Sequence, residues 1–195
     1  MTITSEADLE KLKAIGRICA IARDAMAAAL QPGITTLELD DIGRKVLDDH
    51  GAQSAPEVTY DFPGATCISV NEEIAHGIPG PRVISAGDLV NIDVSAVKDG
   101  VFADTGASYV VPASNPALDK LCRDGKRAMW EGIRAVRSGA PLAAVGPLGR
   151  RGRSGLRGLL GRSGLRGLRR PRARDEQGEP LVQVDRPVDA AQHGA

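Results

Sequence analysis

The chain has 195 residues, of which 26% are charged, and its 25 basic side chains are balanced by 25 acidic ones. Its three cysteines are too few and too widely spaced for a disulfide framework or a zinc cluster, which favours a reduced compartment. No apolar run approaches the length of a membrane span, so we expect a soluble, cytoplasmic protein with one medium-sized domain.

Two amphipathic helices are predicted at the start of the chain. Apolar residues recur at spacings of three and four from Leu9 to Leu30, after an N-cap signal at Ser5, and this pattern ends at Pro32-Gly33. A capping box that begins at Thr35 opens a second, shorter pattern, which ends at His50-Gly51. We expect both helices to cover a sheet rather than to carry a site.

The middle of the chain predicts strands. A short strand is expected at Thr66 to Val70, and two longer ones at 89–94 and 101–111, with Asp99-Gly100 between them. Asp-Gly flanked by alternating apolar residues is a strong hairpin signal. Helical spacing returns from Pro116 to Arg137. The sequence therefore predicts an α+β domain in which helices cover an antiparallel sheet.

The composition changes after Gly146. Residues 1–146 carry 14 basic and 20 acidic side chains and all the lysines, whereas 147–195 carry 11 arginines, no lysine and 5 acidic side chains. The text GRSGLRGL occurs twice in the second part, and 150–174 contains ten Arg and six Gly without an aromatic residue. We therefore predict a first domain at 1–146 and a low-complexity, disordered Arg/Gly-rich tail at 147–195.

Asp93 and Asp104 are the first candidate site residues. If Asp99-Gly100 forms the turn, Ser95 pairs with Asp104, and Asp93 lies on the same face, diagonal to Asp104. Diagonal cross-strand positions are about 7–8 Å apart, close enough for two carboxylates to reach a common cation. Aspartate is poor strand material, and two on one face repel each other unless a positive charge lies between them. From spacing alone, a solvent-facing pair on an open sheet explains these residues better than a metal site does, because antiparallel sheets often have a solvated face.

His76 is the second candidate. It stands between the Glu72-Glu73 pair and the rigid turn 77–80, which reads Gly-Ile-Pro-Gly. A neutral imidazole fixed on such a loop can hydrogen-bond a substrate amide or assist proton transfer. A lone histidine before a turn is more often a surface residue or a satisfied polar group, so the residues alone favour that ordinary reading.

The stretch from Ser54 to Val111 resembles type I methionine aminopeptidases. The matching text is YDFPGATCISVNEEIAHGIPG at 60–80 and GDLVNIDVSAVKDGVFADTGASYVV at 87–111. The pieces NEEIAHGIP, NIDV and FADT occur in the family's order and spacing, which is far more specific than any single short motif. The resemblance implies the N-terminal half of the pita-bread (creatinase/aminopeptidase-like) fold, in which curved antiparallel sheets clasp the metal site.

The resemblance also implies roles for named residues. Asp93 and Asp104 are expected to ligate a dinuclear metal centre, with Asp104 bridging two divalent ions drawn from Co, Mn, Fe, Zn or Ni. His76 is expected to contact the substrate near the scissile bond. Cys67 and Phe62 are expected to help line the pocket for the methionine side chain. Two such ions activate a water molecule as the nucleophile and polarise the scissile carbonyl.

The implied activity is that of a metallo-exopeptidase that removes the N-terminal methionine from nascent polypeptides. The expected partners are therefore peptides with an N-terminal methionine, with the ribosome as a further candidate. Neither a membrane nor a nucleic acid is expected as a partner, and the protein is expected to be a monomer.

The resemblance stops near Gly146. The family's second half supplies a histidine and two glutamates to the metal site, and no segment here matches them, so no role is assigned to Glu176 or Glu179. We interpret the lysine-free text after Pro147 as a shift of reading frame and expect a truncated, impaired enzyme. The alternatives are a non-catalytic fragment or a nucleic-acid-binding protein that uses the Arg/Gly-rich tail, although this tail lacks the aromatic residues that stack on bases.

Overall fold

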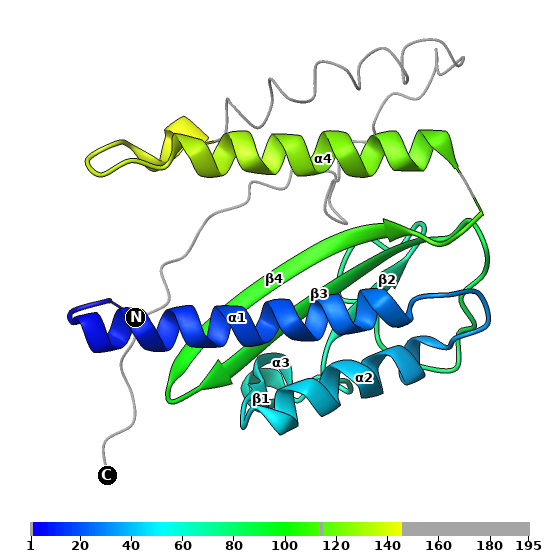
Figure 1. The fold of residues 1–195 in the computed structure, drawn as a ribbon, viewed down its shortest axis with the longest axis horizontal. Helices are drawn as coiled ribbons and strands as arrows, with labels where there is room; N and C mark the ends of the chain where they lie inside the picture. The colour runs from blue at the N-terminus through cyan, green and yellow to red at the C-terminus, as the bar shows by residue number, and fades with distance from the viewer. Residues whose placement is uncertain (1, 114, 146–195) are drawn as a thin grey trace, which may run out of the picture. The chain divides into compact units, whose positions relative to one another are not determined.

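The computed structural model describes residues 2–113 and 115–145, and Figure 1 shows their arrangement. The boundary predicted at 146/147 and the tail predicted to be disordered lie outside these residues. So does the proposed change of reading frame after Pro147.

The two predicted N-terminal helices are present. Helix α1 spans Glu6–Ala29, and its capping box is complete because the Asp8 N–H donates to the Ser5 hydroxyl while Asp8 accepts from the Ser5 N–H. Helix α2 spans Thr36–Asp49 and begins with the same reciprocal arrangement between Thr35 and Glu38. Both helix starts were therefore predicted correctly from a polar residue followed three positions later by an acidic one.

Strand β3 (Leu89–Lys98) is the centre of a four-stranded antiparallel sheet. Strand β4 (Val101–Val110) pairs with it along its whole length. On the other edge, β2 (Cys67–Val70) pairs with residues 90–93 and β1 (Gln53–Ser54) pairs with residues 96 and 97. Figure 1 shows the long β3–β4 hairpin lying across α1.

The hairpin has the predicted turn. Asp99 and Gly100 both have positive φ angles, 52° and 74°, as the central residues of a type I′ turn require. This turn pairs Lys98 with Val101 and Ser95 with Asp104, so the register predicted from the sequence is confirmed. Strand β3 continues to Lys98, beyond the predicted end at residue 94, because the pairing runs without interruption to the turn.

Several elements differ from the expectation or were not predicted. The short helix α3 (Ala55–Tyr60) was missed because six residues contain no full apolar period. Strand β2 begins at Cys67 rather than at Thr66. Helix α4 (Pro116–Ala135) ends before the predicted Arg137 and contacts β4, and a 3-10 turn follows at Leu142–Ala144.

The two faces of the sheet differ in what covers them. Alternate β3 residues on one face, from Val90 to Ala96, are buried with the apolar sides of α1 and α2 and form the core. The intervening residues, from Leu89 to Val97, lie on the opposite face and stay partly accessible. Within the residues that the structure describes, no helix is both long enough and apolar enough to cross a membrane.

Candidate metal centre

Asp93 and Asp104 lie on the accessible face of the β3–β4 hairpin. Asp93 pairs with Gly106 and Asp104 pairs with Ser95, which places the two aspartates diagonally on adjacent antiparallel strands. Residues on this face alternate with the core-facing Val94 and its neighbours, so the strand periodicity alone directs both carboxylates away from α1.

Each aspartate lies opposite a small residue. A Cβ atom added to Gly106 would lie 3.2 Å from Oδ1 of Asp93, so the carboxylate occupies the space that a larger side chain would fill. The hydroxyl of Ser95 donates to Oδ1 of Asp104 at 2.6 Å. The two small partners leave room for the carboxylates to turn toward each other across the strands.

The pKa of Asp93 reflects its burial and the closeness of Asp104. Burial raises the pKa of Asp93 most, and the negative charge of Asp104 and a hydrogen bond with it raise this pKa further, to about 6. The nearby charge of His76 acts in the opposite direction. A pair of carboxyl groups that resists full ionisation is the environment in which a divalent cation is favourable, because one cation compensates both charges.

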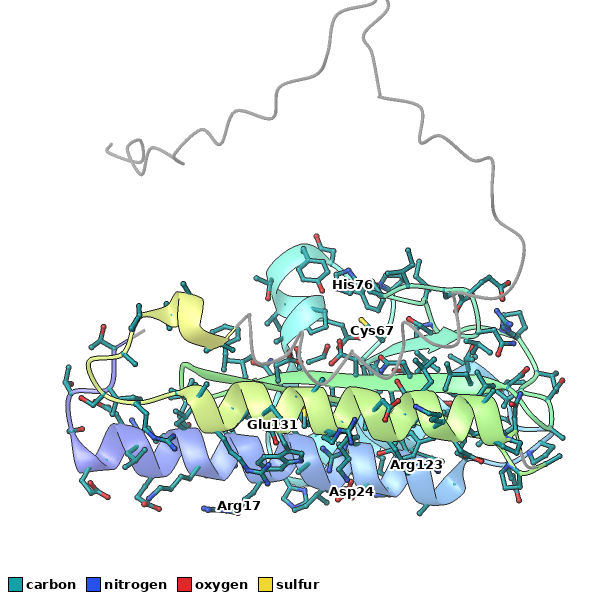
Figure 2. All side chains as sticks on the ribbon, turned by 90° about the horizontal axis from the view of Figure 1, so that it is seen from above. Arg17, Asp24, Cys67, His76, Arg123 and Glu131 are labelled. Atoms are coloured by element: carbon teal, nitrogen blue, oxygen red, sulfur yellow. The ribbon has the colours of Figure 1, made fainter. Side chains whose placement is uncertain are left out.

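His76 lies on the loop between β2 and β3. It adopts a left-handed backbone conformation, with φ of 54°, and its side chain is exposed. Figure 2 shows His76 and Cys67 on the side of the sheet opposite α1. The loop is held against β2 because the Ile68 N–H donates to the Gly77 carbonyl at 2.9 Å and the Gly77 N–H donates to the Ser69 hydroxyl at 3.1 Å.

Cys67 is the neighbour of Asp93 on the β2 side. The two residues pair directly in the sheet, and Cys67 is buried. Burial, and then the negative charges of Asp93 and Asp104, raise the pKa of the Cys67 thiol to about 11. The thiol is therefore protonated at neutral pH and behaves as a small apolar side chain rather than as a nucleophile.

Two aromatic rings stand beside these residues. Tyr60 and Phe62 meet edge to face, with ring centroids 6.2 Å apart and an interplanar angle of 69°. Burial, and then the nearby Cys67, Asp93 and Asp104, raise the pKa of Tyr60, so its hydroxyl lies within electrostatic range of the aspartates. Sequence reasoning selected Phe62 but not Tyr60, although both belong to the text that carries the resemblance.

A buried carboxylate fixes the segment that enters β2. Asp40 of α2 is only 2% exposed, and its oxygens accept from the Ala65 N–H at 3.0 Å and from the N–H and hydroxyl of Thr66 at 2.7 and 2.6 Å. This network explains why Thr66 does not join the strand. Sequence reasoning missed Asp40 because its partners lie 25 and 26 residues away.

The donor set fits one side of a metal site. Asp93 and Asp104 offer carboxylate oxygens, which suit hard and borderline divalent cations such as Mn²⁺. Across 2–113 and 115–145, however, no group of three or more His, Cys, Asp and Glu side chains is arranged to hold a metal ion. The described residues therefore bring at most two such side chains together here, and the metal role of Asp93 and Asp104 stays a prediction.

The chain is similar in sequence to known metallopeptidases. Residues 10–152 match the model of metallopeptidase family M24. The chain is 51% identical over 140 residues to methionine aminopeptidase 2 of Bacillus subtilis, which is 71% of this chain and 56% of that protein. It is also 51% identical over 147 residues to a methionine aminopeptidase of Staphylococcus epidermidis, covering 75% of this chain and 59% of that protein. The chain thus spans little more than half the length of these relatives.

Solved structures extend the comparison to the fold. The crystal structure of methionine aminopeptidase from Rickettsia prowazekii superposes with a TM-score of 0.74 at 33% identity, over 78% of this chain and 61% of that one. An Xaa-Pro dipeptidase from Bacillus anthracis superposes with a TM-score of 0.68 at 18% identity, over 79% of this chain and 42% of that one, which is a likeness of fold alone. The expected half of a pita-bread fold, with helices on an antiparallel sheet, is therefore confirmed.

Proposed function

The chain belongs to metallopeptidase family M24, and from this premise we propose that it forms the part of a methionine aminopeptidase that carries Asp93 and Asp104. The family implies divalent metal ions. The proposed reaction is hydrolysis of the first peptide bond of polypeptides that begin with methionine. The ribosome as a partner and a monomeric state remain predictions.

Asp93 and Asp104 would hold the ions in this proposal. When bound, divalent ions supply Lewis-acid activation of water and of the scissile carbonyl. The sheet contributes rigidity, since both carboxylates stand on paired strands rather than on loops. Metal binding would also release the proton of Asp93, because a carboxyl group must be ionised to act as a ligand.

The residues around the aspartates suit a substrate rather than a structural ion. His76 presents an exposed imidazole on a loop tied to β2, within range of Asp93, where it can hydrogen-bond a peptide group. Cys67 and Phe62 provide uncharged surface for an unbranched thioether side chain. Tyr60 adds a second aromatic ring to that surface.

The observation that carries the proposal is the pairing of Asp93 and Asp104 on one face. Asp104 raises the pKa of Asp93, which shows that two ionised carboxylates are unfavourable at this place unless a cation is present. The small residues opposite them, Gly106 and Ser95, let both carboxylates lie over the same accessible face of the hairpin, where one cation could reach both.

The test measures binding of Mn²⁺ to the full 195-residue chain by isothermal titration calorimetry at neutral pH. Asp104→Asn should abolish binding. Asp99→Asn is the matched control, because it makes the same chemical change on the same hairpin, at the exposed turn, where Asn-Gly also suits a type I′ turn. Equal affinity of wild type and Asp104→Asn would remove the metal role of this pair.

A further inference from the structure

We propose that Ser95 is a positioning residue that fixes the Asp104 carboxylate for the metal ion. This inference rests on the function proposed above and deepens it. Ser95 lies on β3 between the two aspartates, because it follows Asp93 by two residues on the same face and pairs directly with Asp104 across the hairpin.

The contact between Ser95 and Asp104 is short and directional. The Ser95 hydroxyl donates to Oδ1 of Asp104 at 2.6 Å, within the range of about 2.5–2.7 Å that is typical of hydroxyl bonds to a carboxylate. Asp104 is an exposed residue on β4, so packing alone does not fix its side-chain rotamer. The hydrogen bond engages Oδ1 and so fixes the direction in which the Asp104 carboxylate points.

The hydrogen bond from Ser95 counteracts the repulsion between the two aspartates. The two carboxylates lie diagonally on one face, so their like charges repel, and the exposed Asp104 can rotate into solvent. A neutral donor on the opposite strand holds Asp104 over the hairpin without adding a charge that would compete with the cation. Groups that orient a metal ligand in this way typically change metal affinity by about 10–100-fold when they are removed.

A purely structural role for Ser95 predicts a different outcome. The strand pairing of β3 and β4 is made by backbone groups, so the hydroxyl is not needed for the sheet. Ser108 offers a matched comparison, because it stands on the same face of the same hairpin and its hydroxyl is also hydrogen-bonded, accepting from the Asn91 amide at 3.1 Å.

The experiment measures Mn²⁺ affinity of the full chain by isothermal titration calorimetry, with the fold of each variant checked by far-ultraviolet circular dichroism. Ser95→Ala should weaken binding at least about tenfold, whereas Ser108→Ala should leave it unchanged. Ser95→Thr and Ser95→Val form a second pair, since they share a shape and differ only in the hydroxyl. The threonine variant should bind as wild type does and the valine variant should bind as Ser95→Ala does, and this pair decides the matter if Ser95→Ala does not fold.

Each result has one meaning. Unchanged affinity in Ser95→Ala or Ser95→Val overturns the role of Ser95 while leaving the metal pair intact. An equal loss in Ser108→Ala overturns it too, because the effect then belongs to the hairpin as a whole. A wild-type chain that binds Mn²⁺ no better than Asp104→Asn overturns the proposed metal pair, and the role of Ser95 with it.

Discussion

Gly77 provides a sharp test of how the loop that carries His76 is held. A Cβ atom at position 77 would lie 2.1 Å from the carbonyl oxygen of Ile68 and 2.9 Å from the Cα atom of Ser69. Both obstacles are backbone atoms of β2, which is anchored in the sheet, so they cannot rotate away as a flexible side chain can. Gly77→Ala must therefore push the loop off the strand.

The loss of stability in Gly77→Ala follows from the hydrogen bonds that this movement breaks. The loop loses the hydrogen bond from the Ile68 N–H to the Gly77 carbonyl and the one from the Gly77 N–H to the Ser69 hydroxyl. Ile68 is 1% exposed, so its N–H would be left without an acceptor, at about 1–3 kcal/mol. With the second bond included, we expect the free energy of unfolding to fall by about 2–4 kcal/mol, a large part of the 5–15 kcal/mol of a typical domain.

The assay is urea unfolding of the full chain, monitored by far-ultraviolet circular dichroism. Gly125→Ala is the control, because position 125 lies inside α4 with no atom within 4 Å of the added Cβ. That variant should gain about 0.5–1 kcal/mol from its helix propensity. If Gly77→Ala unfolds within about 1 kcal/mol of wild type, the loop is free to leave β2 and His76 is not held in place.

Three further predictions concern the carboxylates. For the metal-free chain, the pKa of Asp93 is raised from 3.8 to about 6, so the proton is held more tightly in the folded state and the free energy of unfolding should fall as pH rises from about 4 to about 6. The fall should be about 1 kcal/mol, discounted for solvent because Asp93 is only half-buried, and a flat titration of wild type, or the same fall in Asp93→Asn, would contradict it. Asp40→Ala, which leaves three donors without an acceptor, should lower stability in urea by about 3–5 kcal/mol, whereas Asp48→Ala at the exposed end of α2 should cost under about 1 kcal/mol. Finally, the chain should release little or no methionine from a Met-Gly-Met peptide with added Co²⁺ or Mn²⁺, because its described residues supply only two ligands; robust turnover that Asp104→Asn abolishes would refute this.

The sequence predicted those features of the fold that depend on neighbouring residues. The helix starts at Ser5 and Thr35 follow from reciprocal capping within one turn, and the hairpin follows from Asp99-Gly100 and the alternation around it. The register then placed Asp93 and Asp104 on one face by counting alone. Their metal role came from the resemblance, because spacing alone favours a solvent-facing pair.

The features that were missed depend on contacts between distant residues. Asp40 reaches Thr66 from another element, and nothing near Asp40 in the sequence marks it as the anchor of β2. Gly77 is required by the approach of a loop to β2, which only the folded chain shows. The register predicted that Ser95 lies opposite Asp104, but not that its hydroxyl donates to the Asp104 carboxylate. In each case the physical signal arises from tertiary geometry.

The hairpin also bears on the order of folding. Its two strands are joined by a two-residue turn, so the contacts that unite Asp93 with Asp104 are local in the chain, whereas β1 and β2 must return to β3 from more distant segments. Hairpins close in about 1–10 μs, and local pairings precede those that require large loops to close. We therefore expect the two like charges to meet before the rest of the sheet assembles. A divalent cation captured at that stage would accelerate refolding, and not only retard unfolding.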